Sequence, residues 1–306
     1  MKKLTLSLLA VLFAVGMVVA QSNQATSSQR GDGNKGFATQ TGAENVTNLS
    51  QGSQGGTDIG NDNESVVIQT GNRNRADQTQ DGDANGVFIT QIGDENFAEQ
   101  VQGGGTAGTG NLSNIEQTGN NNFATVAQVT SDNSATILQT GDGNAAAIQQ
   151  EAGDNNTAFI EHGGDGNSSI LTQVGGDNMG SVIVNGDDNV AKISQEGEAN
   201  MSILTVDGDD NESELVTTGD GNEASVFVTG NDNVANVAQD GNFNTLLIEA
   251  DGSLNTIEAT ASGSGNDATI NISGNSNRAI TTQIGNSNLS SSTIIGSGNI
   301  REVTQN

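Results

Sequence analysis

The chain has 306 residues, contains no Cys, Trp, Tyr or Pro, and carries a formal net charge of −28 at pH 7. The lack of Cys excludes disulfides and a lipid anchor on cysteine, and the acidic balance makes nucleic acid and anionic membrane surfaces poor partners. Low aromatic content with high net charge is typical of disordered chains, but the order of the residues argues against disorder.

Residues 1–20 are predicted to be a secretory signal peptide. Two lysines follow Met1, and an almost unbroken apolar stretch then runs from Leu4 to Val19. We place cleavage before Gln21, which leaves 286 residues with a net charge of −30. A membrane anchor is the alternative, but the apolar stretch barely reaches the roughly 20 residues needed to span a bilayer. Residues 21–30 are interpreted as an N-terminal leader.

A tetrapeptide Gly-x-x-Asn recurs 24 times along the rest of the chain, with Thr130 replacing the Gly once. From Asn156 to Asn299 the step between copies is 11 residues, thirteen times in succession. Longer intervals predict loop insertions near 52–59 and 103–107. A fixed internal period is the signature of a repeat architecture.

Each copy is predicted to form one strand and one turn. Counted from the Asn as position 0, position +2 is mostly Ala or Ser, +4 mostly Val, Ile or Leu, and +6 mostly Gln. These positions share one face of an extended strand, so Asn85, Val87, Ile89 and Gln91 should point inward. The aromatic residues of the strands occupy odd positions and should face outward. Gly-x-x supplies the reversal, because Gly adopts backbone angles closed to other residues.

These features predict an all-β chain that forms a β-solenoid, or β-helix, over residues 31–306. Two 11-residue strand-turn units close one rung of about 22 residues, which gives about twelve two-strand rungs. At roughly 4.8 Å per rung the stack would be about 55 to 60 Å long. An 11-residue rung is the alternative, but it leaves too little chain to cross the core twice without cross-links.

Stacking should bring equivalent positions into register and turn each inward column into a ladder of like side chains. A buried amide is costly alone, but stacked amides satisfy one another along the axis. The predicted stacking ladder for self-assembly comprises Gln69, Gln80, Gln91, Gln117, Gln128, Gln139, Asn74, Asn85, Asn96, Asn122, Asn133 and Asn144. The predicted turn glycines are Gly71, Gly82, Gly93, Gly119 and Gly141.

The sequence predicts no enzyme and no catalytic, metal or cofactor site. His162, the one histidine, occupies a Gln place in the ladder, and every Ser lies in a repeat slot, so we expect no nucleophile-base pair and no zinc site. Fifteen of the 24 turns carry Asp or Glu between Gly and Asn. These acids either bridge divalent cations or form a solvated acidic edge. The last six turns carry none, which makes 262–300 a candidate docking segment unless the composition merely drifts.

The unit Gln-x-Gly-x-x-Asn-x-Ala-x-x-x-Gln, present at 69–80 and 117–128, resembles the curlin repeat of bacterial curli subunits. The resemblance covers 31–306. It implies a secreted subunit that polymerises with itself into an extracellular, cell-surface amyloid fibre for biofilm matrix and adhesion. It also implies export through the periplasm and a dedicated outer-membrane pore, with seeding by a nucleator subunit. A monomeric or surface-attached solenoid adhesin, with or without cations at its acidic turns, is the alternative.

Overall fold

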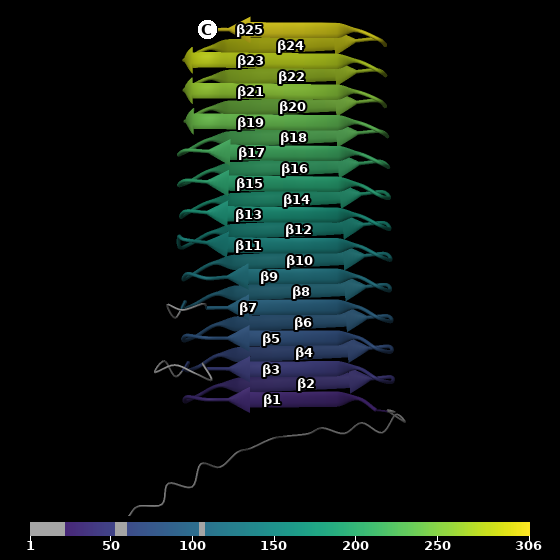
Figure 1. The fold of residues 1–306 in the computed structure, drawn as a ribbon, viewed down its shortest axis with the longest axis vertical. Helices are drawn as coiled ribbons and strands as arrows, with labels where there is room; N and C mark the ends of the chain where they lie inside the picture. The colour runs from purple at the N-terminus through teal and green to yellow at the C-terminus, as the bar shows by residue number, and fades with distance from the viewer. Residues whose placement is uncertain (1–21, 53–59, 104–107) are drawn as a thin grey trace, which may run out of the picture.

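A computed structural model describes residues 22–52, 60–103 and 108–306. The predicted signal peptide and most of the two predicted loop insertions lie outside these residues. The described chain forms 25 strands stacked in a single column, and it contains no helix (Figure 1). A search of these residues for a helix long and apolar enough to cross a membrane found none.

Successive strands alternate between two sheets in which every neighbouring pair is parallel. The 13-stranded sheet contains β1 (Gln24–Gln29), β3 (Val46–Gln51), β5 (Arg75–Gln80), β7 (Phe97–Gln102), β9 (Phe123–Gln128), β11 (Ala145–Glu151), β13 (Ser168–Val174), β15 (Val190–Glu196), β17 (Glu212–Thr218), β19 (Val234–Asn242), β21 (Thr256–Ser264), β23 (Arg278–Asn286) and β25 (Ile300–Gln305). The 12-stranded sheet contains β2 (Lys35–Thr41), β4 (Glu64–Thr70), β6 (Gly86–Ile92), β8 (Leu112–Thr118), β10 (Ser134–Thr140), β12 (Thr157–Gly163), β14 (Met179–Asn185), β16 (Met201–Asp207), β18 (Glu223–Thr229), β20 (Thr245–Asp251), β22 (Asp267–Ser273) and β24 (Leu289–Ile295).

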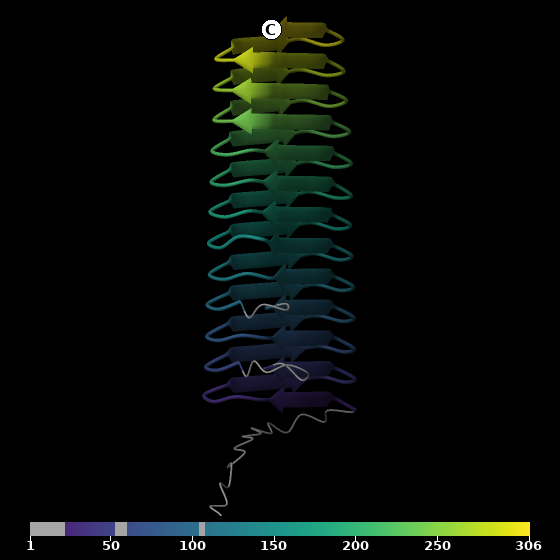
Figure 2. The same ribbon diagram turned by 60° about the vertical axis from the view of Figure 1, so that its left-hand side comes forward.

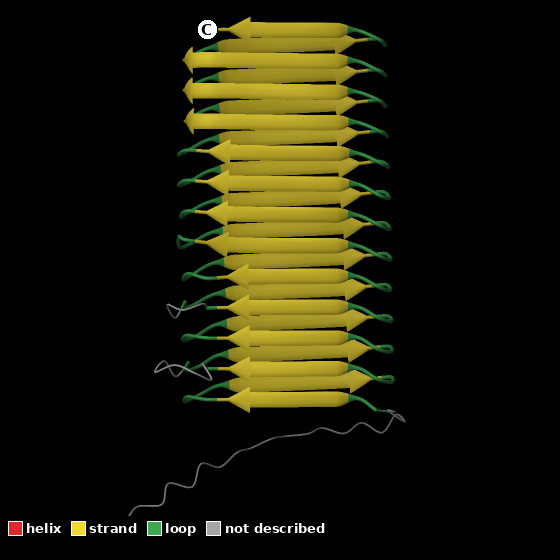
Figure 3. Cartoon of the chain, viewed as in Figure 1, coloured by secondary structure: helices red, strands yellow, loops and turns green. Residues whose placement is uncertain are grey.

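Two consecutive strands complete one rung. Odd-numbered strands run in one direction and even-numbered strands in the other, and a turn at each side of the column joins them (Figures 2 and 3). Met201 of β16 lies in register with Glu223 of β18, which fixes the rung at 22 residues. The predicted two-strand rung is therefore confirmed, and the 11-residue rung is wrong. Thirteen strands spaced by roughly 4.8 Å span about 58 Å.

Side chains alternate between the interior and the solvent along nearly every strand. In β6, Val87, Ile89 and Gln91 are buried, and their neighbours are more exposed. The small residues at +2 let the two sheets approach closely around a thin core of aliphatic residues at +4. The rings of Phe97 and Phe123 stack on the outer face with their centroids 5.1 Å apart, as expected for odd positions.

The solenoid begins earlier than the sequence analysis placed it. Residues 21–30 were interpreted as a leader, but Gln24–Gln29 form β1 and pair in register with Val46–Gln51 of β3. Asn23 takes position 0, and its Oδ1 accepts the backbone N–H of Asn45 at 2.9 Å. This copy escaped the sequence search because no Gly stands three residues before its Asn.

Candidate self-assembly site

The buried glutamines form two hydrogen-bonded ladders, one in each sheet. In the 13-stranded sheet, each Nε2 donates to the Oε1 of the next rung from Gln29 through Gln195, by way of Gln51, Gln80, Gln102, Gln128, Gln150 and Gln173. In the 12-stranded sheet the ladder runs through Gln40, Gln69, Gln91, Gln117 and Gln139. The thinning of Gln toward the C-terminus occurs mostly in the 12-stranded sheet, where Val, Ala or Ile occupies position +6 from Val184 onward.

Each ladder glutamine after Gln29 also donates to a backbone carbonyl of the facing sheet. Gln128 is 1% exposed, and its Oε1 accepts from Nε2 of Gln102 at 2.9 Å. Its Nε2 donates to Oε1 of Gln150 at 2.9 Å and to the carbonyl of Leu112, in the facing sheet, at 3.1 Å. Both amide hydrogens are used, so the side chain cannot be replaced by a carboxylate without losing donors.

The position-0 asparagines bond to the backbone more than to one another. The backbone N–H of Asn74 donates to Oδ1 of Asn45 at 2.9 Å, and Nδ2 of Asn74 donates to the carbonyl of Gly93 in the following turn at 2.7 Å. The same bond, from a backbone N–H to Oδ1 of the Asn one rung earlier, is made by Asn85, Asn96, Asn122, Asn133 and Asn144. The Asn ladder therefore fastens each turn to the turns above and below it.

The turn glycines hold backbone angles that favour Gly, and they lie against the next turn. Gly141 has φ +117°, and a Cβ placed on it would lie 2.1 Å from the carbonyl oxygen of Gly164. The other predicted turn glycines, Gly71, Gly82, Gly93 and Gly119, also have positive φ, and a Cβ on Gly71, Gly93 or Gly119 would meet a carbonyl of the next turn. Where Thr130 replaces Gly, Nδ2 of Asn111 is buried without a hydrogen-bond partner.

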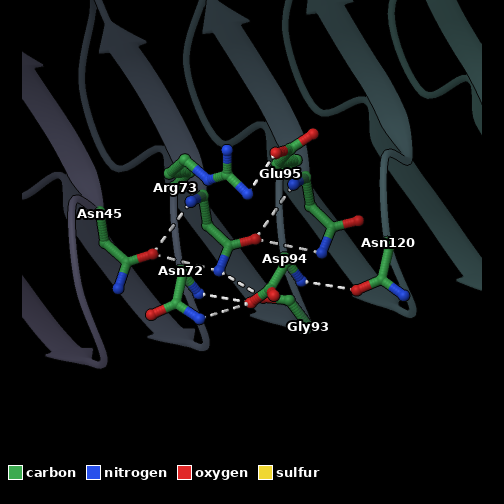
Figure 4. Close-up of polar contacts among 9 residues, drawn as sticks. Asn45, Asn72, Arg73, Gly93, Asp94, Glu95 and Asn120 are labelled. Atoms are coloured by element: carbon green, nitrogen blue, oxygen red, sulfur yellow. Dashed lines mark hydrogen bonds and ion pairs between the residues drawn. The ribbon is translucent and has the colours of Figure 1, made fainter.

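The residue after each turn Gly forms a third ladder, which the sequence analysis missed. Oδ1 of Asp94 accepts the backbone N–H of Asn72 at 2.7 Å and its Nδ2 at 3.0 Å (Figure 4). Asp165 accepts the N–H of Asp142 in the same way, at 2.7 Å. The signal is present in the sequence, because this position is Asp, Asn, Ser or Thr in 21 of 24 turns.

This ladder gives the acidic turns a structural role that neither sequence interpretation included. A carboxylate at this place satisfies a backbone N–H of the preceding rung and stays at least partly exposed to solvent. Within the described ranges, no three acidic or histidine side chains converge into a group that could hold a metal ion.

His162 corrects one expectation about nucleophile-base pairs. Its Nε2 lies 2.6 Å from Oγ of Ser169, so the structure does bring a hydroxyl and an imidazole together. Both residues are 1% exposed, and Nδ1 of His162 is buried without a partner. A substrate cannot reach this pair. His162 lies in register between Gln139 and Val184, and it ends the Gln ladder of the 12-stranded sheet.

Acidification should destabilise the solenoid through His162. Burial lowers the pKa of His162 from 6.5 to about 4, so between these values the unfolded chain binds a proton that the folded chain excludes. The burial of His162 therefore costs nothing above pH 6.5, where the unfolded chain is also neutral at this residue. The free energy of unfolding then decreases as the pH falls from 6.5 to about 4. At 1.36 kcal/mol per pKa unit, the loss reaches about 3 kcal/mol.

The matched variant is His162→Gln, since Gln is the usual residue at this position. Its unfolding midpoint in guanidinium should change less than that of the wild type between pH 7 and pH 4. Carboxylates also titrate near pH 4, and burial raises the pKa of Asp81, so the informative quantity is the difference between the two proteins. Parallel midpoint curves would contradict the assignment.

Both ends of the column expose interior positions. At the N-terminal end Ala25 and Ser27 are exposed although they occupy inward positions, and at the C-terminal end Arg301 is exposed and Val303 half-buried. No strand or helix of the described chain covers either end. Solenoids that remain monomeric generally need caps there.

Side chains of β25 cover the C-terminal edge of β24. The carbonyls of Leu289, Ser291 and Thr293 face the open end, because alternate residues of a parallel strand direct their C=O toward the next strand. Nε2 of Gln305 donates to the Leu289 carbonyl at 2.8 Å. The Arg301 guanidinium donates to Ser291 at 3.3 Å and Thr293 at 3.5 Å. An inward-pointing charge of this kind protects a strand edge.

The comparison with protein families matches this repeat. The family described as curlin associated repeat aligns with residues 108–137 and 130–161. Residues 108–161 contain curlin associated repeats. The matched region begins in the turn before β8 and ends in β12, and the 11-residue Gly-x-x-Asn period of this chain continues through the C-terminal strands beyond it. A comparison with curated proteins gave no match.

Proposed function

We propose that the mature chain is a secreted structural subunit that stacks end to end into extracellular, curli-like amyloid fibres for biofilm matrix and surface adhesion. The observation that carries this proposal is the open end of each sheet. Asn side chains and turn acceptors reach both ends, and glutamines stand there too, Gln29 and Gln40 at the N-terminal end and Gln305 at the C-terminal end, so a second copy would offer the next rung. Parallel in-register stacking of this kind is the bonding pattern of cross-β fibres.

Export and localisation follow from the same proposal. Residues 1–20 would direct the chain to the periplasm, and a curli-type outer-membrane pore would pass the mature chain to the cell surface, where a nucleator subunit starts the fibre. The curlin repeat match supports this route. We propose no catalytic role, since the Ser169–His162 pair is sealed in the core.

Purified mature chain, beginning at Gln21, tests the fibre directly. We expect thioflavin fluorescence to rise with time, negative-stain images to show unbranched fibres, and fibre diffraction to give a reflection near roughly 4.8 Å along the axis. A chain that stays monomeric at high concentration, with the same β-rich circular dichroism, would instead identify an adhesin-type solenoid.

Arg301→Ser should speed fibre growth several-fold. Ser occupies position +2 in other copies, such as Ser290, and it removes the guanidinium that covers the carbonyls of β24. The matched control is Arg278→Ser, which removes the same charge from an outward position where Arg278 pairs with Glu258. The measurement is elongation from preformed wild-type seeds. Equal acceleration by both variants would show that net charge, rather than the covered edge, limits growth.

A further inference from the structure

The described solenoid has an odd number of strands, and this number limits how two copies can stack. β1 and β25 both belong to the 13-stranded sheet, while β2 and β24 end the other sheet. If a second copy stacked without rotation, its β1 would follow β25 directly. One strand position would then stay empty between β24 and the second copy's β2.

A half turn about the column axis removes this vacancy. Strands of the two sheets run in opposite directions, so a half turn gives each sheet the place and direction of the other (Figures 1 and 3). We propose that consecutive copies in the fibre are related by a half turn, with β1 of the second copy on β24 and its β2 on β25. This inference rests on the proposed function and specifies the geometry of the contact.

The turns at the two ends match under this rotation. The last turn, Gly296 to Asn299, lies on the opposite side of the column from the first turn, Gly31 to Asn34. The half turn places one over the other, and both have the sequence Gly-x-Gly-Asn. Without rotation, the last turn would face the stretch before β1, where a mature chain beginning at Gln21 has no complete Gly-x-x-Asn turn.

Donors of the last turn find acceptors in the first turn. Inside the solenoid, Nδ2 of Asn277 donates to the Gly296 carbonyl at 2.8 Å. At the end of the column, Nδ2 of Asn299 still donates to Oδ1 of Asn277 at 3.1 Å, but in place of a Gly carbonyl it has only the Ile295 carbonyl at 3.5 Å. In the half-turn stack Asn299 gains the carbonyl of Gly31 from the second copy. Asp32 of that copy would accept the backbone N–H of Ser297, as Oγ of Ser297 accepts the N–H of Asn275 inside the solenoid.

The Gln ladder also continues across the contact. Nε2 of Gln283 donates to Oε1 of Gln305 at 3.0 Å. Gln40 is the first glutamine of the 12-stranded sheet, and that sheet has no described strand below β2. In the half-turn stack, Nε2 of Gln305 reaches Oε1 of the second copy's Gln40. The small Gly36 of β2 lies above the Arg301 position.

Engineered disulfides can distinguish the half turn from the other arrangements, because the chain has no Cys. Thr26, Phe37, Ser291 and Glu302 are all exposed and occupy position +3 of the four end strands. Paired residues on adjacent strands lie about 4.8 Å apart, within disulfide reach. The half turn predicts fibre disulfides for the pairs Thr26→Cys with Ser291→Cys and Phe37→Cys with Glu302→Cys.

The readout is a non-reducing gel of oxidised fibres after they are dissolved in denaturant. We expect ladders of linked subunits for those two pairs and for neither of the swapped pairs. If the pair Thr26→Cys with Glu302→Cys links instead, the copies stack without rotation and leave one strand position empty. If the pair Phe37→Cys with Ser291→Cys links, β2 of the second copy lies on β24 without rotation and β1 has left its place in the column. Either result overturns the proposal. Single-Cys variants must stay unlinked, and Thr269→Cys with Ser291→Cys must link within one subunit.

Two glycine variants test the contact without a cross-link. A Cβ on Gly274 would lie 2.0 Å from the Gly296 carbonyl above it. On Gly296 or Gly285, a Cβ meets nothing closer than 3.4 Å and 3.8 Å within the free subunit, and the two φ values are similar, +110° and +104°. In the half-turn stack the Gly31 carbonyl of the second copy lies over Gly296. A mature chain beginning at Gln21 has no residue to place over Gly285.

We therefore expect Gly296→Ala to slow seeded elongation at least tenfold, and Gly285→Ala to elongate at close to the wild-type rate. Unfolding midpoints of the two soluble variants should agree, since both carry the same backbone strain. A stronger effect of Gly285→Ala, or equal effects, overturns the half turn while leaving fibre formation intact. If the wild type forms no fibre, the proposed function fails and this inference fails with it.

Discussion

Replacing Gly141 with alanine should destabilise the solenoid by more than about 3 kcal/mol, whereas the same change at Gly143 should cost about 1 kcal/mol. The two glycines lie in one turn, and both have positive φ, +117° and +70°. A Cβ on Gly141 would lie 2.1 Å from the carbonyl oxygen of Gly164, while a Cβ on Gly143 meets nothing within 4 Å.

The difference arises because the Gly164 carbonyl cannot move freely. It accepts a hydrogen bond from Nδ2 of Asn144 at 2.8 Å, so displacing it weakens the Asn ladder as well as the turn. The turn position that Gly143 occupies accepts a side chain in other copies, because Ala84 and Ala199 adopt φ +57° and +55° there.

Unfolding midpoints in guanidinium, followed by circular dichroism of soluble protein, measure both variants. The wild type and Gly143→Ala should unfold close together, and Gly141→Ala well below them. If both variants lose the same stability, backbone strain alone matters, and the close approach of successive turns contributes nothing.

The sequence predicted the fold because its period and parity are geometric constraints. An 11-residue period with a one-residue alternation admits one strand and one turn, and only two such units return the chain to its starting side. The inward residues Asn85, Val87 and Gln91 are buried as expected. The chain has no Pro, and a Gly marks nearly every turn, so the sequence shows no competing pattern of secondary structure.

The site was predicted in part. Burial of the ladder residues follows from the alternation of inward and outward positions along each strand. The separation into two Gln ladders depends on which copies share a sheet, and the sequence analysis treated all copies as one column. The pairing of Asn74 with the Gly93 carbonyl could not be predicted, because it depends on the stagger between successive turns. β1 was missed because its Asn23 lacks the turn Gly.

The cap on the C-terminal edge could not be predicted for a different reason. Arg301 occupies a +2 position, where parity predicts an inward side chain in contact with the next rung. No described rung follows β25, so the guanidinium instead bends across to the carbonyls of the facing sheet. A repeat pattern describes the interior of a solenoid, where every copy has two neighbours, and it loses its force at the ends.

Gln128→Glu should destabilise the solenoid more than Gln128→Leu at pH 7, and the order should reverse in acid. Leucine leaves Nε2 of Gln102 and Oε1 of Gln150 without their partners, at a cost of about 1 to 3 kcal/mol that does not depend on pH. A carboxylate can still accept from Gln102, but it faces the oxygens of Gln150 and Leu112 without a proton to donate.

The cost of the glutamate has a calculable ceiling. The buried side chain can escape its charge by binding a proton, and taking that proton up at pH 7 against an unfolded pKa of about 4.3 costs about 4 kcal/mol. Its folded pKa is raised, so this cost is present above the folded pKa and disappears as the pH falls below about 4.3. The protonated acid regains one donor toward Gln150 or Leu112, which leucine never has.

Unfolding midpoints of both variants, taken from pH 7 to pH 3 in the His162→Gln background, measure the crossing. That background removes the buried histidine, whose own titration would otherwise overlap the same range. The leucine variant should be the more stable at pH 7 and the glutamate variant at pH 3. Two variants that match the wild type at every pH would place the +6 side chains in water, in conflict with the buried Gln ladder.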